Sequence, residues 1–119
     1  MPQPYIPAMA SIFTRIRERQ VPAKIFYEDD NVIVIADHRP KDSVHLLLIP
    51  REEYPTFYET PPEVLNMLNE TAKKVAEMLG IADHFRILIN NGYGQEIFHV
   101  HYHLMSNRGR DRLRFLEES

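Results

Sequence analysis

The sequence contains no cysteine and no tryptophan, and glycine occurs only four times in 119 residues. Without cysteine, the chain can form no disulfide, no thiolate nucleophile and no zinc or iron–sulfur site with sulfur ligands. Any metal site would therefore have to use histidine and carboxylate ligands alone. The lack of cysteine also agrees with a cytoplasmic protein, which is the location we expect.

An excess of positive charge is missing too. The chain has 14 Lys and Arg against 17 Asp and Glu, a formal net charge of -3, so sequence-independent binding to nucleic acid is not expected. No stretch approaches the roughly 18 apolar residues of a membrane-spanning helix, and the first ten residues lack the pattern of a signal peptide. We therefore expect neither a nucleic acid nor a membrane as a partner.

The length and composition are those of one globular domain, with 44% hydrophobic and 26% charged residues. Residues 1–10 carry Pro2, Pro4 and Pro7 and no periodic pattern, which predicts an extended N-terminal arm. We expect residues 11–119 to form a single domain whose core spans residues 11–106.

Two helices are predicted. The first is short, with Ser11 as its N-cap and Pro22 beyond its end. The second and longer helix begins with Thr60-Pro61-Pro62-Glu63, which reads as a capping box with proline at the first helical position. Apolar residues then recur at helical spacing as far as Leu79, and Gly80 supplies a left-handed stop.

The remaining periodic segments favour strands, because they are short, rich in β-branched and aromatic residues, and bounded by turn residues. Helices do not alternate with them often enough for a parallel sheet. We therefore predict an α+β fold with an antiparallel sheet of about five strands, one long helix and one short helix. The predicted strands are residues 24–28, 31–36, 44–49, 85–90 and 97–105.

Three of the six histidines, His99, His101 and His103, alternate within five positions of the last predicted strand. Alternate residues of a strand share one face, so the three imidazoles should project to the same side of the sheet. On a solvated face they gain little packing and repel one another when protonated, so stability alone does not explain them. A functionless polar surface, a metal site and nucleophilic catalysis at phosphorus remain open, and spacing alone does not separate the last two.

The cluster His99-Val100-His101-Tyr102-His103-Leu104-Met105 resembles the signature of the histidine triad (HIT) superfamily, in which histidines alternate with apolar residues. The resemblance extends over residues 11–106 and is greatest to the Hint branch, purine nucleoside phosphoramidases that cleave the P–N bond of adenosine or guanosine phosphoramidates, including aminoacyl adenylates. Blocks that carry it include Ser11-Ile12-Phe13, Tyr27-Glu28-Asp29-Asp30, Ala36-Asp37, His45-Leu46-Leu47-Leu48-Ile49-Pro50, and Gly94-Gln95 before the triad.

The resemblance implies a HIT-like fold, a homodimer whose two sheets join edge to edge, a purine nucleotide (AMP or GMP moiety) as ligand, and neither a metal nor another cofactor. Hydrolysis of dinucleoside polyphosphates is an alternative, because it uses the same nucleophile on a P–O bond. A nucleotide-binding regulatory protein and a histidine-based zinc binder are alternatives from other classes.

The resemblance also implies catalytic roles. His101 is the nucleophile and forms a nucleotidyl-histidine, and the backbone carbonyl of His99 holds its other ring nitrogen. His103 binds the phosphate and helps to protonate the leaving amine, while His45 completes the cluster. A poor amine leaving group requires that proton.

The nucleotide-binding residues that the resemblance implies fall into three groups. Asp37 binds both ribose hydroxyls, although an Asp at this point is also typical of a turn. Glu96 stands where relatives often have Ser or Thr, and an acid beside a phosphate repels it unless it points to solvent. The phosphate residues are Asn90, Gly94, Gln95, Glu96 and Ile97; the apolar walls of the base pocket, each of which could be plain core, are Ile12, Phe13, Ile16 and Ile35.

Overall fold

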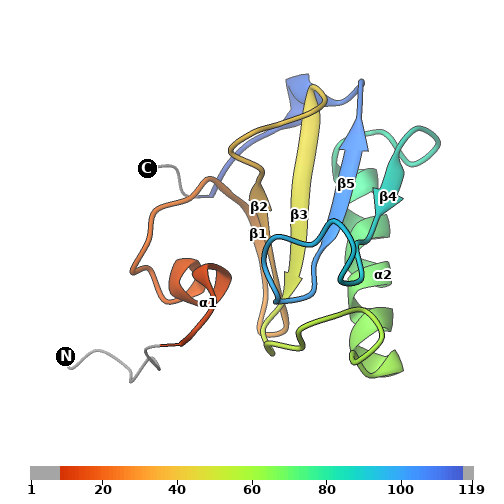
Figure 1. The fold of residues 1–119 in the computed structure, drawn as a ribbon. Helices are drawn as coiled ribbons and strands as arrows, with labels where there is room; N and C mark the ends of the chain where they lie inside the picture. Colours follow the sequence, from red (N-terminus) through yellow and green to blue (C-terminus); the bar gives the residue numbers. More distant parts are fainter. Residues whose placement is uncertain (1–8, 117–119) are drawn as a thin grey trace.

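The computed structural model describes residues 9–116 and forms one five-stranded antiparallel sheet in the order β1-β2-β3-β5-β4 (Figure 1). The predicted α+β class and antiparallel sheet are confirmed. Most of the predicted N-terminal arm lies outside the described residues. Along the chain the elements are α1 (Ile12–Arg17), β1 (Ile25–Glu28), β2 (Val32–Ala36), β3 (Val44–Pro50), α2 (Pro62–Met78), β4 (Arg86–Leu88), β5 (Tyr102–Ser106) and the short 3-10 helix η1 (Arg110–Arg112).

The central strands are buried on both faces, because α1 and α2 lie on opposite sides of the sheet (Figure 1). Leu46 and Leu48 of β3 pack with α2, in a cluster that includes Leu68 and Val75. Residues one position along face the other way, so Leu47 and its neighbours pack in a second cluster with Phe13 and Ile16 of α1. All seven residues of β3 are buried, as expected of a central strand covered on both sides.

Helix α1 begins as predicted, since the Ser11 side chain accepts a hydrogen bond from the Thr14 backbone N–H. The capping box predicted for α2 is wrong. Pro61 is the N-cap, and the Thr60 hydroxyl donates to the Thr56 carbonyl at 2.6 Å instead. Thr60 therefore lies one residue too early to cap the helix. At the other end, Gly80 has the predicted left-handed conformation, with φ of 70°.

The last two strands are shorter than predicted. β4 covers only Arg86–Leu88 of the predicted segment 85–90, and β5 begins at Tyr102, so residues 97–101 precede the sheet. The reason is that residues 97–101 have hydrogen-bond partners other than a neighbouring strand. The His99 ring bonds the Pro50 carbonyl, and the Val100 N–H donates to the Tyr54 carbonyl at 2.7 Å. This segment is thus tied to the end of β3 and the residues just after it, rather than paired along a neighbouring strand.

Within residues 9–116, no helix combines the length and the apolar character that crossing a bilayer requires.

Candidate active site

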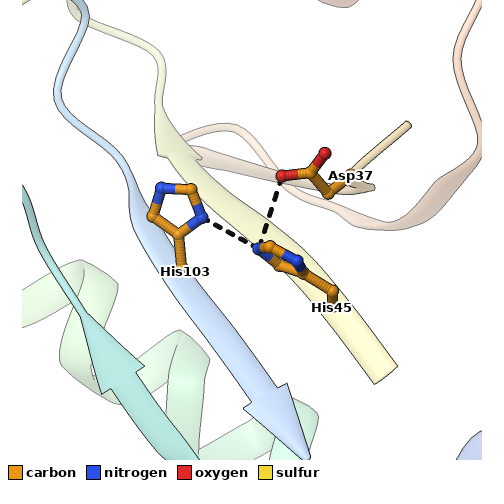
Figure 2. Close-up of side chains that lie close together, drawn as sticks. All are labelled: Asp37, His45 and His103. Atoms are coloured by element: carbon orange, nitrogen blue, oxygen red, sulfur yellow. Dashed lines mark hydrogen bonds and ion pairs between the residues drawn. The ribbon is translucent and has the colours of Figure 1, made fainter. Parts of the chain in front are cut away.

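The sheet register brings two histidines from distant parts of the sequence to one face. In the antiparallel pair β3–β5, Leu47 lies opposite His103 and Met105 lies opposite His45. Because opposite residues share a face and alternate residues along a strand do too, His45 and His103 both lie on the face that α1 covers. Figure 2 shows their rings side by side, with Asp37, which directly follows β2, next to them.

These three side chains form a short hydrogen-bonded group. His45 Nε2 lies 2.9 Å from His103 Nδ1 and 3.3 Å from Asp37 Oδ2 (Figure 2). On its other ring nitrogen, His45 Nδ1 lies 3.1 Å from the backbone nitrogen of Lys41. A backbone N–H can only donate, so we assign the proton of neutral His45 to Nε2, from which it is donated to His103 Nδ1. The proton of neutral His103 then sits on Nε2.

The triad residues His99 and His101 are linked in a similar way. His101 Nδ1 lies 2.8 Å from the His99 backbone carbonyl oxygen, which can only accept. The proton of neutral His101 is therefore on Nδ1, and Nε2 carries a free lone pair. The Phe13 ring packs edge-on against both rings, 5.0 Å from the centroid of His101 and 5.6 Å from that of His99. The ring centroids of His101 and His103 are 5.1 Å apart, so the two rings are neighbours.

Burial favours the neutral form of all four histidines. It lowers the pKa of His45, of His99 and of His101, outweighing the nearby carboxylates and carbonyls that raise it. Burial also lowers the pKa of His103 to about 4, and repulsion from His101 and His45 in their protonated forms acts in the same direction. At neutral pH the site thus holds neutral imidazoles with defined donors and acceptors.

The solvated sheet face expected for the triad is wrong for His99, which is only 1% exposed. The rings of His101 and His103 are neighbours, yet the triad residues do not all lie on a strand, because β5 begins after His101. The His99 ring instead bonds the Pro50 carbonyl and the Ser11 hydroxyl, so it is part of the support of the site.

The residues predicted to bind the nucleotide differ in their contacts and in their exposure. Asp37 keeps one carboxylate oxygen near His45, while the other accepts the Arg39 N–H at 2.8 Å in a local turn. The Asn90 side chain lies against Gly94, where an added Cβ would come within 3.3 Å of Asn90 Oδ1. Gln95 bonds its own loop and the Pro55 carbonyl, and the Glu96 side chain is exposed.

The predicted walls of the base pocket are mostly core. Phe13, Ile16 and Ile35 are 4%, 7% and 4% exposed and belong to the cluster between α1 and the sheet. Ile97 packs partly buried against that cluster, and Ile12 is 38% exposed. Ile12 and Ile97 are therefore the members of the predicted set that leave most surface for a ligand.

Among residues 9–116, one group could hold a metal ion by distance. The ligand atoms of Asp37, His45 and His103 all lie within 4.8 Å of one another. Zinc would need the Nε2 lone pair of His45, because zinc binds an unprotonated imidazole nitrogen. The proton of His45 would then have to move to Nδ1. There it would face the Lys41 N–H, which is also a donor, and the hydrogen bond between them would be lost. The hydrogen bonds of this group therefore favour proton handling over metal binding.

Sequence reasoning missed three contributors to the site: the Lys41 N–H, the Thr14 hydroxyl and the Glu53 carboxylate. Glu53 accepts hydrogen bonds from the Ser11 N–H and the Thr14 hydroxyl, 42 and 39 residues away in the sequence. Contacts at such separations leave no periodic or local signal. Ser11 itself was predicted only as a helix cap.

Comparisons with known proteins show the family of the chain. The family model described as "HIT domain" matches residues 18–110. An uncharacterised HIT-like protein of Synechocystis is 44% identical over 103 residues, covering 82% of this chain and 90% of that protein. The purine nucleoside phosphoramidase of Escherichia coli K12 is 36% identical over 107 residues, covering 85% and 90%.

Solved structures give the same result. A HIT family hydrolase from Clostridium thermocellum matches with a TM-score of 0.78 and 39% identity, over 84% of this chain and 92% of that chain. A zinc-bound histidine triad family protein from Mycobacterium smegmatis matches with a TM-score of 0.77 and 30% identity, over 95% and 85%. With its fold, its triad and its relatives in agreement, the chain belongs to the HIT family.

The lowered histidine pKa values predict how folding stability depends on pH. The folded protein binds fewer protons than the unfolded chain wherever a histidine pKa is depressed, so stability falls as the pH drops. For His103 the loss should begin near pH 6.5 and level off near pH 4. Urea unfolding at a series of pH values should give a shallower pH dependence for His103→Asn than for the wild type. Equal slopes for the two proteins would contradict the depressed pKa.

Proposed function

We propose that the protein is a hydrolase that cleaves the P–N bond of purine nucleoside phosphoramidates, with His101 as its nucleophile. The observation that carries the proposal is the orientation of the His101 ring, whose Nδ1–H is held at 2.8 Å by the His99 carbonyl. This leaves the Nε2 lone pair free to attack phosphorus. The 36% identity to the Escherichia coli purine nucleoside phosphoramidase supports this substrate class.

In the first step, His101 Nε2 attacks the α-phosphorus, the P–N bond breaks and the amine departs. The product is a nucleotidyl-histidine whose imidazole is positively charged. The His99 carbonyl faces that charge across the Nδ1–H bond and stabilises it. Water then attacks phosphorus, and His101 leaves as a neutral imidazole.

Proton transfer falls to His103. Its Nδ1 accepts from His45, so its Nε2 is the nitrogen that exchanges a proton with the substrate. In the free protein, His103 is neutral at pH 7. An arriving phosphate anion raises the pKa of a nearby imidazole, so we infer that a proton is taken up together with the substrate. His103 gives it to the leaving amine and later takes one from the attacking water.

The first test removes the nucleophile. We expect His101→Gly to abolish turnover of an adenosine phosphoramidate while the protein stays folded, because His101 is a chemical rather than a packing residue. Release of AMP by 31P NMR measures the reaction, and circular dichroism checks the fold. The matched control is His84→Ala, whose ring hydrogen-bonds Asn107 instead.

Two further arms separate the alternatives. Faster cleavage of a diadenosine polyphosphate than of the phosphoramidate would favour the dinucleoside polyphosphate hydrolase. A rate that a chelator removes and zinc restores would favour the metal site. Near-normal activity of folded His101→Gly would remove the nucleophile assignment altogether.

Binding of the ribose is proposed for Asp37. We expect Asp37→Ala to raise KM by the equivalent of about 1–3 kcal/mol, because two ribose hydroxyls lose a charged acceptor. A 2′,3′-dideoxy substrate should bind the wild type more weakly and lose nothing further on the variant. Steady-state kinetics on both substrates, with exposed Asp83→Ala as the control, measure the coupling. An equal penalty for the dideoxy substrate on both proteins would show that Asp37 does not touch the ribose.

We also propose that two copies join along β4. This strand is last in the sheet order, its three residues are all exposed, and Ile87 and Leu88 are 36% and 46% exposed. An apolar edge strand presents unpaired backbone groups to another strand, and a second copy pairs with them symmetrically.

Light scattering after gel filtration tests the dimer. We expect the wild type at twice its 14.0 kDa mass, and Leu88→Lys as a monomer, because the charge would be buried at the shared edge. Ala82→Lys, which adds the same charge at an exposed position just after α2, should remain dimeric. A wild-type monomer, or a dimeric Leu88→Lys, would contradict pairing along β4.

A further inference from the structure

A group of hydrogen bonds that none of the proposed steps uses surrounds the start of α1. The Ser11 hydroxyl lies 2.5 Å from His99 Nδ1, and the Thr14 backbone N–H donates to the same hydroxyl oxygen at 3.2 Å. Helix α1 is thereby attached to the first triad histidine through its own N-cap.

Glu53 holds the same turn of α1 from the other side. One carboxylate oxygen accepts the Ser11 backbone N–H at 3.0 Å, and the other accepts the Thr14 hydroxyl at 2.7 Å. Glu53 lies just beyond the end of β3, so it connects α1 to the central strand of the sheet. We call Ser11, Thr14 and Glu53 the clasp.

The protons of the clasp can be assigned. His99 Nε2 lies 2.7 Å from the Pro50 carbonyl, which only accepts, so the His99 proton is on Nε2. His99 Nδ1 is then an acceptor, and the Ser11 hydroxyl is its donor. Both ring nitrogens of a fully buried histidine are thus used, and rotation of the ring would lose two hydrogen bonds inside the protein.

Fixing His99 also fixes what lies next to it. The backbone carbonyl of His99 is the acceptor for His101 Nδ1, and the Phe13 ring of α1 packs against both imidazoles. A shift of α1 or of His99 would therefore displace the group that orients the Nε2 lone pair of His101. Displacements of about 1 Å at a reacting group can reduce a rate by roughly 100-fold.

We propose that Ser11 and Glu53 are positioning residues, which hold His99 and α1 in place so that His101 keeps a single tautomer and a single ring orientation. The kinetic consequence rests on the proposed function. The effect on the His101 ring does not, because it is a property of the free protein.

The test uses two matched pairs of variants. Ser11→Gly removes the hydroxyl but keeps most of the N-cap stability, whereas Ser11→Thr restores a hydroxyl. Glu53→Ala removes the carboxylate, and Glu52→Ala changes an exposed neighbour. Long-range 1H–15N NMR spectra of the free proteins report the ring tautomers, and steady-state kinetics give kcat and KM separately.

We expect Ser11→Gly to show a mixture of His101 tautomers and a kcat about 10- to 100-fold lower, with a smaller change in KM. Glu53→Ala should move both readouts in the same direction, while Ser11→Thr and Glu52→Ala stay near the wild type. Should Ser11→Gly fail to fold, the His101 tautomer and the kcat of Glu53→Ala test the proposal in the same way. An unchanged His101 tautomer and an unchanged kcat in the folded variants would overturn the proposal. A wild type without phosphoramidase activity would refute the proposed function, and the NMR readout would still decide the role of the clasp.

Discussion

Backbone groups determine which nitrogen of His45, His99 and His101 carries the proton, and His45 in turn determines the tautomer of His103. The carbonyls of Pro50 and His99 accept from His99 Nε2 and His101 Nδ1, and the Lys41 N–H donates to His45 Nδ1. Backbone groups cannot exchange donor and acceptor roles, so they impose a direction on side chains that otherwise have two neutral tautomers. The free lone pair of His101 and the free N–H of His103 both follow from this constraint.

The two-sided core makes that constraint possible. A histidine within a central strand must lose its hydration, which costs free energy unless both ring nitrogens find partners. His45 finds them in the Lys41 N–H and in His103 on the neighbouring strand. Helix α1 closes the same face, so the imidazoles are shielded enough for their pKa values to fall below the ordinary range. The layer between α1 and the sheet thus supplies both part of the hydrophobic core and the burial that lowers the pKa values of the imidazoles.

The sequence predicts those parts of the fold that a local pattern of residues determines. Short runs rich in β-branched and aromatic or other apolar residues, bounded by turn residues, located β1, β2 and β3, and helical spacing located α2 with its stop at Gly80. Prediction failed where a hydrogen-bond partner outside the predicted element competes. Residues 97–101 alternate like a strand but are captured by carbonyls of Pro50 and Tyr54, and Thr60 resembles an N-cap but bonds Thr56. Similarly, the sequence placed His99 and His101 in a cluster, but no pattern in it links Glu53 to Ser11.

The charge of the site bears on how it would act on a phosphate. Its imidazoles are neutral at pH 7, and the Asp37 carboxylate lies beside His45, so the site offers an anion hydrogen-bond donors rather than fixed positive charge. Neutral donors bind a phosphate less strongly than lysine or arginine would, but they leave His101 unprotonated, as its proposed role of nucleophile requires. A cationic site would also lower the pKa of His103. In the proposed mechanism the phosphate raises the pKa of His103, so the acid forms when a substrate is bound, and the nucleophile and the acid need not compete for protons in the free protein.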